Sequence, residues 1–168
     1  MLKDALPTFA KLQDQQRPAP RHADARVQKL IHFFEHLQLA DLAQLPRLYT
    51  PEAYFKDPFH SVQGVAEIDA IFRRMFTTLE APRFTVHSVI AEGAQCFMTW
   101  DFDALRNGRP LHIHGSSHLL FDLQGRVALH RDYWDAAEEL YEQVPLLGGL
   151  LRWLKRRIAG PAAQLSRD

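Results

Sequence analysis

The sequence predicts an α+β fold in which helices from the first half of the chain pack on one face of a curved antiparallel sheet formed by the second half. Two observations lead to this prediction. Apolar residues recur at spacings of three and four as far as Leu79, whereas after Pro82 they alternate with polar residues. Asn107-Gly108 then separates two alternating segments, and this dipeptide favours the type I′ turn of a β-hairpin.

Three helices are expected before Pro82. The first begins near Ala23 and has an apolar face of Val27, Leu30, Ile31, Phe34 and Leu37. A second, short helix is predicted with Asp41 as its cap and with Leu42, Leu45 and Leu48 on one side, and Pro46 limits its length. Thr50-Pro51 predicts a break, followed by a short extended segment, Ala53 to Asp57, that Pro58 ends. Gly64 precedes the third helix, whose apolar side holds Val65, Ile68, Phe72, Met75 and Leu79.

Four strands are expected after Pro82, over residues 83–91, 95–106, 109–121 and 126–134. Gly93, Asn107-Gly108 and Gly125 mark the turns between them. Because each turn is short, consecutive strands should pair as an antiparallel meander.

The register of the central hairpin follows from a two-residue turn at Asn107-Gly108. Arg106 then lies opposite Arg109, and one face pairs Asp103 with His112, Asp101 with His114 and Thr99 with Ser116. The other face pairs Phe102 with Ile113, Trp100 with Gly115, Met98 with Ser117 and Cys96 with Leu119. The second face is far more apolar, so it should face the helices. Gly115 would give the Trp100 ring the room it needs.

The last hairpin decides which residues of the final strand point inward. A turn of two or four residues between Asp122 and Gly125 would place His130, Asp132 and Trp134 on the inner face, whereas a three-residue loop with a bulge would reverse them. Polar groups on an apolar face are costly unless they are paired or used. Aromatic walls with a few polar groups are typical of a small-molecule site.

Length and composition exclude several classes of protein. A chain of 168 residues fits one domain with a sizeable core, and its one cysteine excludes a disulfide framework and cysteine-based metal sites. The formal net charge of +0 argues against a nucleic-acid binder. No secretory signal and no apolar run of about 18 residues is found, so we expect a soluble, cytoplasmic protein.

Three regions are expected along the chain. Residues 1–22 form a loose, proline-containing tail, residues 23–142 form the domain, and residues 143–168 form an amphipathic basic helix and tail. This last segment is similar to helices that lie on an anionic membrane, and the alternative is a helix packed on the domain or on a dimer partner. Contact with a membrane surface would involve Leu147, Leu150, Leu151, Trp153, Leu154, Lys155, Arg156 and Arg157.

Several segments together resemble a known superfamily. They are Leu37 to Leu42, Tyr49, Phe55-Lys56-Asp57-Pro58, Gly64, Ile68 and the closing run from Arg126 to Asp135. This pattern is similar to the nuclear transport factor 2-like (cystatin-like) fold and, within it, to the SnoaL-like polyketide cyclase group, with ketosteroid isomerase and limonene-epoxide hydrolase as relatives. The resemblance implies a cone-shaped domain with a deep pocket, and a homodimer that forms through the outer face of the sheet. The same fold hosts enzymes, carriers and interaction modules.

The resemblance also implies roles for individual residues. Asp57 matches the general base of the isomerase, but the isomerase's helical tyrosine falls on Phe33 and its strand aspartic acid on Ser117. Phe33 cannot donate a hydrogen bond, so that oxyanion hole is not reproduced. Asp132 matches the water-activating aspartate of the epoxide hydrolase, whose other polar groups fall on Trp100, Phe102 and Phe55. Asp57, Asp132 and His130 therefore remain as an acid/base set.

Each candidate residue also has a structural interpretation. Asp57 can simply cap a turn, Asp132 can pair with a neighbour, and His130 can be a satisfied core histidine. His112, His114 and His118 share a face, but cross-strand pairs with Asp103 and Asp101 explain the first two, and residues 112 and 118 would lie about 20 Å apart. We therefore predict no metal site. Cys96 is expected in the core.

Two hypotheses follow. The first is a cofactor-independent isomerase, cyclase or hydrolase that uses Asp57, Asp132 and His130 on a small apolar molecule. The second is a non-enzymatic binding protein for a lipid-like ligand, with the C-terminal helix on a membrane surface. In both cases the ligand would contact Phe33, Phe55, Met98, Trp100, Phe102, Ser117 and Trp134.

Overall fold

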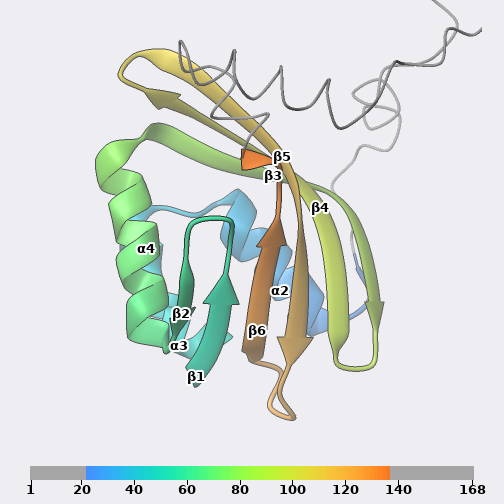
Figure 1. The fold of residues 1–168 in the computed structure, drawn as a ribbon. Coiled ribbons are helices and arrows are strands. Elements are labelled where there is room, and N and C mark those ends of the chain that lie inside the picture. Colours follow the sequence, from blue (N-terminus) through green and yellow to red (C-terminus); the bar gives the residue numbers. More distant parts are fainter. Residues whose placement is uncertain (1–21, 137–168) are drawn as a thin grey trace, which may run out of the picture. The chain divides into compact units, whose positions relative to one another are not determined.

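The computed structural model describes residues 22–136 and has the predicted α+β architecture (Figure 1). The helical elements are α2 (Ala25–Glu35), the 3-10 helix η1 (Leu39–Gln44), α3 (Leu45–Leu48) and α4 (Val65–Thr78). The strands are β1 (Tyr49–Lys56), β2 (Ser61–Gln63), β3 (Glu80–Glu92), β4 (Gln95–Arg106), β5 (Arg109–Phe121) and β6 (Val127–Tyr133). No helix within this described range is long and apolar enough to cross a membrane.

The sheet is mixed, which corrects the prediction of a purely antiparallel meander. Its six strands lie in the order β2-β1-β6-β5-β4-β3. Strands β3 to β6 form the predicted meander, whereas β1 runs parallel to β6 and pairs antiparallel with the short strand β2. The predicted break at Thr50-Pro51 is also wrong, because both residues lie within β1. Proline cannot donate a ladder hydrogen bond, and Pro51 falls in the stretch between Tyr49 and Tyr54 where the register with β6 shifts.

The second helix begins earlier than predicted. Gln38, not Asp41, occupies the N-cap position of η1. Asp41 is the third residue of the helix, and its Oδ2 accepts a hydrogen bond of 3.0 Å from the Gln38 N–H. Asp41 therefore stabilises the helix start as the reciprocal partner in a capping box. Pro46 stands in the first turn of α3, where its missing N–H costs nothing.

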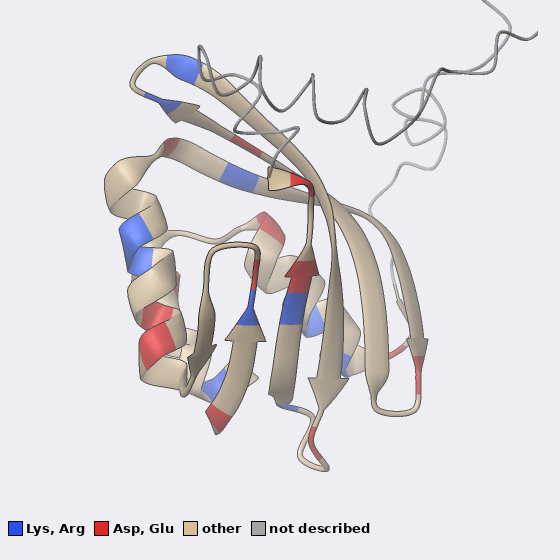
Figure 2. Cartoon of the chain, in the orientation of Figure 1, with Lys and Arg blue, Asp and Glu red and all other residues tan. Residues whose placement is uncertain are grey.

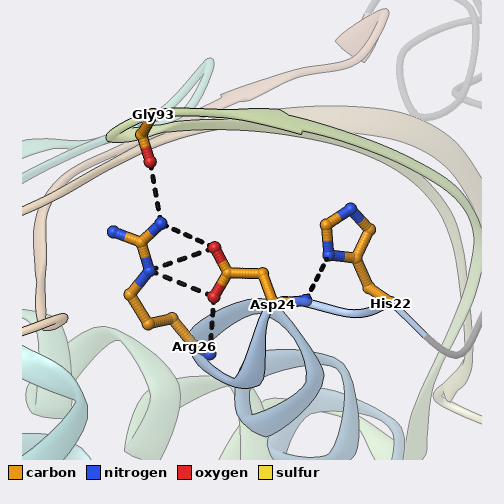
Figure 3. A network of polar contacts seen from close by, with 4 residues as sticks. All are labelled: His22, Asp24, Arg26 and Gly93. Carbon is orange, nitrogen blue, oxygen red and sulfur yellow. Dashed lines mark hydrogen bonds and ion pairs between the residues drawn. The ribbon is translucent and has the colours of Figure 1, made fainter.

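A polar network ties α2 to the far end of the sheet (Figure 3). Asp24 caps α2 by accepting the Arg26 N–H at 2.9 Å, and the Arg26 guanidinium donates both to Asp24 and, at 2.7 Å, to the carbonyl of Gly93 in the β3–β4 turn. The hydrogen bond from Arg26 is the main reason that the pKa of Asp24 falls to about 2. The ion pair with Asp24 thus orients the Arg26 guanidinium, whose hydrogen bond to Gly93 joins the helix start to this turn.

The helices cover one face of the curved sheet, and the core lies between them. Val27, Leu30, Ile31, Phe33 and Phe34 of α2 are buried, as are Ile68 and Phe72 of α4. The charged residues of α4 lie on its other side (Figure 2), where Arg73 pairs with Asp69 at 2.6 Å. This is the amphipathic arrangement that the apolar spacing predicts.

The β4–β5 hairpin has the predicted register at every pair from Cys96–Leu119 to Arg106–Arg109. Asn107 and Gly108 both have positive φ, at 53° and 72°, as the type I′ turn requires. Gly115 faces Trp100, and a Cβ at Gly115 would lie 2.5 Å from the Trp100 ring. The glycine therefore makes room for the indole.

The β5–β6 hairpin turns His130 and Asp132 inward by a route that differs from the predicted one. Residues 122–126 form the loop, because Phe121 pairs with Val127. The register then shifts by one residue, so that Leu120 pairs with Leu129, Leu119 with His130 and Ser117 with Asp132. Ala128 is the bulged residue, and it restores the inward direction for the residues that follow.

Two compact units divide the chain, and the fold described above concerns the first, which ends at Trp134. The second begins at Asp135. The predicted tail, apart from His22, and the predicted amphipathic helix in residues 143–168 lie outside the described residues.

Candidate functional site

A hollow opens on the inner face of the sheet, between the sheet and the helices. Its atom-free space is about 350 Å³, a figure that includes open solvent. Among the described residues it is lined by Phe34, Phe72, Phe84, Val86, Met98, Trp100, Ser117, His130 and Asp132. The walls are therefore mainly aromatic, and the polar side chains come from β4, β5 and β6.

Five side chains form a continuous chain of hydrogen bonds along this inner face. Trp100 Nε1 donates to Ser117 Oγ at 2.8 Å, and Ser117 Oγ donates to Asp132 Oδ1 at 2.5 Å. His130 Nε2 lies 2.8 Å from the same Asp132 oxygen. His130 Nδ1 lies 2.7 Å from the hydroxyl of Tyr49. Four strands thus contribute to one network.

The partners assign the proton of His130 to Nε2. A carboxylate oxygen only accepts, so the ring nitrogen that faces Asp132 must carry a proton. Nδ1 then accepts from the Tyr49 hydroxyl, and every polar hydrogen in the network has an acceptor. A protonated imidazolium would leave the buried Tyr49 O–H without one. The network is therefore complete with a neutral His130 and an ionised Asp132.

Tyr49 is fully buried at the start of β1. Burial, followed by the negative charge of Asp132, raises the pKa of Tyr49 well above its ordinary value. The hydroxyl therefore keeps its proton and remains a donor to His130. The His130 ring itself is held between Phe34 and Phe55, whose ring centroids lie 5.8 and 5.0 Å away.

One oxygen of Asp132 is left over. The Asp132 side chain is 16% exposed and lines the hollow. Its Oδ1 accepts from both Ser117 and His130, whereas Oδ2 has no hydrogen-bond partner among residues 22–136. Two donors to Oδ1 fix the carboxylate plane and leave Oδ2 available to a bound molecule.

The structure brings together five of the predicted site residues. Asp132, His130, Ser117, Trp100 and Met98 all line the hollow. The catalytic and ligand-contact roles assigned to them from the sequence stay predictions.

Asp57 lies elsewhere, in the turn between β1 and β2. Its Oδ1 accepts the N–H groups of Phe59 and His60 at 2.7 and 2.5 Å, and its carboxylate contacts the His60 ring at 3.0 Å. It is not among the described residues that line the hollow. These contacts are those of a turn cap, and the role of Asp57 as a base stays a prediction.

The other four predicted ligand contacts do not line the hollow in the described part of the chain. Phe33 and Phe55 are buried behind it, and Phe55 supports the His130 ring. Phe102 packs on Phe84 with a centroid distance of 4.7 Å. Trp134 packs on Phe59, at 5.3 Å, near the β1–β2 turn.

Sequence reasoning did not assign Tyr49, Phe34, Phe72, Phe84 or Val86 to the site. Phe34 and Phe72 belong to predicted apolar helix faces, and Phe84 and Val86 pair with Phe102 and Trp100 of the inner face. That pairing could have identified the last two. Tyr49 reaches His130 only because β1 lies beside β6, and no local signal in the sequence reveals this parallel pairing.

The outer-face histidines pair across strands as predicted. His112 Nδ1 lies 2.8 Å from Asp103, and His114 Nδ1 lies 2.6 Å from Asp101. His118 contacts Gln95 at 3.2 Å and stacks on Phe97. A bulge in β3 adds the buried His87, whose Nε2 lies 2.7 Å from Asp101. Partial burial raises the pKa of Asp101, but the contacts with His114 and His87 outweigh it and leave this pKa below its ordinary value.

Several solved structures have the same fold, and their names include an epoxide hydrolase and a putative polyketide cyclase. TsrD from Streptomyces laurentii is 25% identical with a TM-score of 0.62, covering 76% of this chain and 98% of that one. An epoxide hydrolase of the limonene-epoxide hydrolase-like type from M. tuberculosis is 18% identical (TM-score 0.57, coverage 80% and 92%). A putative SnoaL-like polyketide cyclase from Shewanella putrefaciens is also 18% identical (TM-score 0.61, coverage 73% and 100%).

A search of curated protein sequences finds no match. The family model described as the SnoaL-like domain matches residues 30–130. This span runs from the middle of α2 to His130 and includes eight of the nine described residues around the hollow. With the nuclear transport factor 2-like architecture of the solved relatives, the match shows that the chain belongs to the SnoaL-like domain family.

Proposed function

We propose that the protein binds a small, largely apolar molecule in the hollow and that Asp132 acts there as a general base, in isomerase, cyclase or hydrolase chemistry. The observation that carries the proposal is the unequal hydrogen bonding of the two Asp132 oxygens. Ser117 and His130 hold Oδ1, and Oδ2 is left without a partner among the described residues while Asp132 lines the hollow. A base needs both a fixed direction and a free lone pair.

The proton balance of such a reaction closes without a cofactor. A C–H or O–H bond of the bound molecule breaks, its proton moves to Asp132 Oδ2, and the electron pair stays on the molecule. In an isomerisation, the proton returns to another atom of the same molecule. In a ring closure, the electron pair forms a new bond to an electrophilic carbon, and the oxygen that leaves that carbon takes the proton. The carboxylate is restored in both cases.

Family membership and fold support this class of reaction. The chain belongs to the SnoaL-like domain family, and solved structures of the same fold carry the names epoxide hydrolase and polyketide cyclase. The network differs in composition from the sites of the relatives used in the resemblance, because Trp100 and Ser117 take positions that the resemblance matches to ionisable residues there. The reaction class is therefore argued from Asp132 itself.

The test begins with the ligand that co-purifies with the full chain, identified by mass spectrometry. That ligand is then incubated with the protein in D₂O, and deuterium incorporation or conversion is followed by NMR. Asp132→Asn should abolish the exchange. Asp103→Asn is the matched control, since Asp103 is an exposed outer-face carboxylate paired with His112. Equal exchange by both variants would rule out Asp132 as the base.

A non-enzymatic binding protein is the second candidate, and the dominance of aromatic walls in the hollow favours it. A ligand that stays bound without exchange or conversion would support this candidate. Its membrane part rests on residues 143–168 and is tested by liposome flotation of the full chain. Changing Lys155, Arg156 and Arg157 together to Glu should abolish flotation on anionic vesicles, and unchanged flotation would contradict the membrane proposal.

A further inference from the structure

We infer that the hollow selects a small alkylammonium ion, a protonated amine with an apolar body, over neutral and anionic molecules of the same size. This inference rests on the proposed use of the hollow as a binding site, but it does not require turnover. It follows from the donors, the charge and the aromatic surface around the hollow, taken in turn.

No free hydrogen-bond donor is found among the described side chains that line the hollow. The polar hydrogens belong to Trp100, Ser117 and His130, and each is used within the network. Trp100 donates to Ser117, and both Ser117 and His130 donate to Asp132. Tyr49, behind them, donates to His130. A carbonyl or carboxylate ligand would therefore have to break one of these bonds to be bound, at the cost of a buried unpaired group.

The side chains do offer a free acceptor, and it is charged. Asp132 Oδ2 has no hydrogen-bond partner among residues 22–136. A ligand with an N–H or O–H group satisfies it without disturbing the network. The complementary ligand is thus a donor.

The charge of the lining residues favours a protonated amine over a neutral hydrogen-bond donor. Asp132 is the only ionised side chain among the described residues that line the hollow, and no Lys or Arg is among them. A protonated amine would neutralise that carboxylate, whereas an alcohol would leave its charge largely unbalanced. Attraction between opposite charges strengthens where water is scarce, and this gain must exceed the cost of taking both ions out of water.

The aromatic walls suit the rest of a cation. Four aromatic side chains line the hollow, and the centroids of neighbouring rings lie 5.8 to 6.1 Å apart: Phe34, Phe72, Phe84 and Trp100. Aromatic rings attract alkylammonium groups through their quadrupoles while burying the methyl groups. The atom-free space of about 350 Å³ includes open solvent, so it sets only an upper bound on the size of a ligand near Oδ2.

Four probes of nearly equal size separate these contributions. They are tert-butylammonium, tetramethylammonium, tert-butanol and isobutyrate, titrated into the full chain at pH 7 and followed by NMR shifts of the Trp100 indole and the Met98 methyl. We expect tert-butylammonium to bind at least tenfold more tightly than tert-butanol. Tetramethylammonium, which has the charge but no N–H, should fall between them, and isobutyrate should be the weakest.

Two variants localise the effect. Asp132→Asn should reduce tert-butylammonium binding at least tenfold, to the level of tert-butanol, while Asp103→Asn leaves it unchanged. Unfolding curves of both variants establish that they are folded. Equal binding of tert-butanol, tighter binding of isobutyrate, no binding of any probe, or tight binding that survives Asp132→Asn would each overturn the inference. A neutral co-purified ligand that incorporates deuterium in an Asp132-dependent way would also overturn the inference, but it would support the proposed function.

Discussion

The hydroxyl of Tyr49 lies 2.7 Å from Nδ1 of His130, although 81 positions separate the two residues. The hydroxyl keeps its proton because burial raises its pKa, so it donates to the ring. His130 then presents its Nε2 hydrogen to Asp132. Tyr49, which is not among the described residues that line the hollow, thereby helps to orient the carboxylate across the parallel β1–β6 pair.

Tyr49→Phe should lower the free energy of unfolding by about 1–3 kcal/mol, because it leaves the buried Nδ1 of His130 without a donor. Urea unfolding measures this loss, and ¹⁵N NMR of the imidazole should show an Nδ1 signal shifted toward that of an unbonded ring nitrogen. Tyr54→Phe is the matched control on the same strand, since the Tyr54 hydroxyl forms a hydrogen bond with the Ser61 hydroxyl at an exposed position. It should change stability by less than about 0.5 kcal/mol. Equal losses in the two variants would contradict the role of Tyr49.

Gly115→Ala should destabilise the protein by about 1–3 kcal/mol, because the new methyl group would stand 2.5 Å from the Trp100 ring. The displaced indole should also lose its hydrogen bond to Ser117, which changes the NMR signal of its Nε1 hydrogen. Ser116→Ala, one position along and on the other face, is the control. A Gly115→Ala protein with unchanged stability and an unchanged indole signal would show that the close approach is not required.

Asp24 should stabilise the protein in a pH-dependent way. Its pKa in the folded state, about 2, lies below the ordinary value of 3.8. The stabilisation is therefore complete above about pH 4 and is lost as the pH falls through about 2. Asp24→Asn retains a capping oxygen but removes the charge, so its deficit relative to the unmodified chain should shrink as urea unfolding is repeated from pH 5 to pH 2. A deficit that stays constant over this range would exclude the ion pair with Arg26 as its source.

Cys96 should be almost inert toward alkylation in the folded protein. Its side chain is buried, and burial, with the charge of Asp24 as a second cause, raises its pKa to about 11. At pH 8 only about one thiol in a thousand is then ionised. Iodoacetamide labelling followed by mass spectrometry should be slow in buffer and fast in 8 M urea. Rapid labelling of the folded chain would contradict this, because the thiolate is the reacting form.

The homodimer through the outer sheet face stays a prediction, and exposed apolar residues on that face support it. Ile90 and Phe97 pair across β3 and β4 and are 74% and 47% exposed. Phe97→Asp should raise the dimer dissociation constant at least tenfold in sedimentation experiments, because it would place a charge within the contact. Leu123→Asp, at a fully exposed position in the β5–β6 loop, should not. A chain that sediments as a monomer without any substitution would end the prediction.

The local parts of the fold are visible in the sequence because they depend on neighbouring residues. The apolar faces of α2 and α4, the turn at Asn107-Gly108 and the whole β4–β5 register follow from spacing and turn chemistry. The parallel β1–β6 pair does not, because its partners are about 75 positions apart and no turn connects them. The extended segment predicted from Ala53 to Asp57 largely coincides with the second half of β1, whereas the short strand β2, which pairs with β1, is not predicted.

The site divides in the same way. Trp100 and Ser117 come from the β4–β5 hairpin, so alternation places them on one face, whereas His130 and Asp132 share that face because of the bulge at Ala128. Tyr49 contacts His130 because β1 pairs parallel with β6. Phe34 and Phe72 line the hollow from two helices, and the sequence does not specify how these helices pack on the sheet. The orientation of Oδ2 depends on all of these contacts together, and only the assembled structure reveals it.

The bulge at Ala128 has a consequence for how this chain is compared with others. If Ala128 were paired in a regular ladder instead of bulging, a hairpin closed by the Phe121–Val127 pair would place His130 and Asp132 on the outer face and Arg131 and Tyr133 on the inner face. The His-Arg-Asp-Tyr segment at residues 130–133 would then place its histidine and aspartate on the protein surface and not in the hollow. Two relatives that share a His-Arg-Asp-Tyr segment therefore have equivalent sites only if their hairpins also share the same loop length and the same bulge.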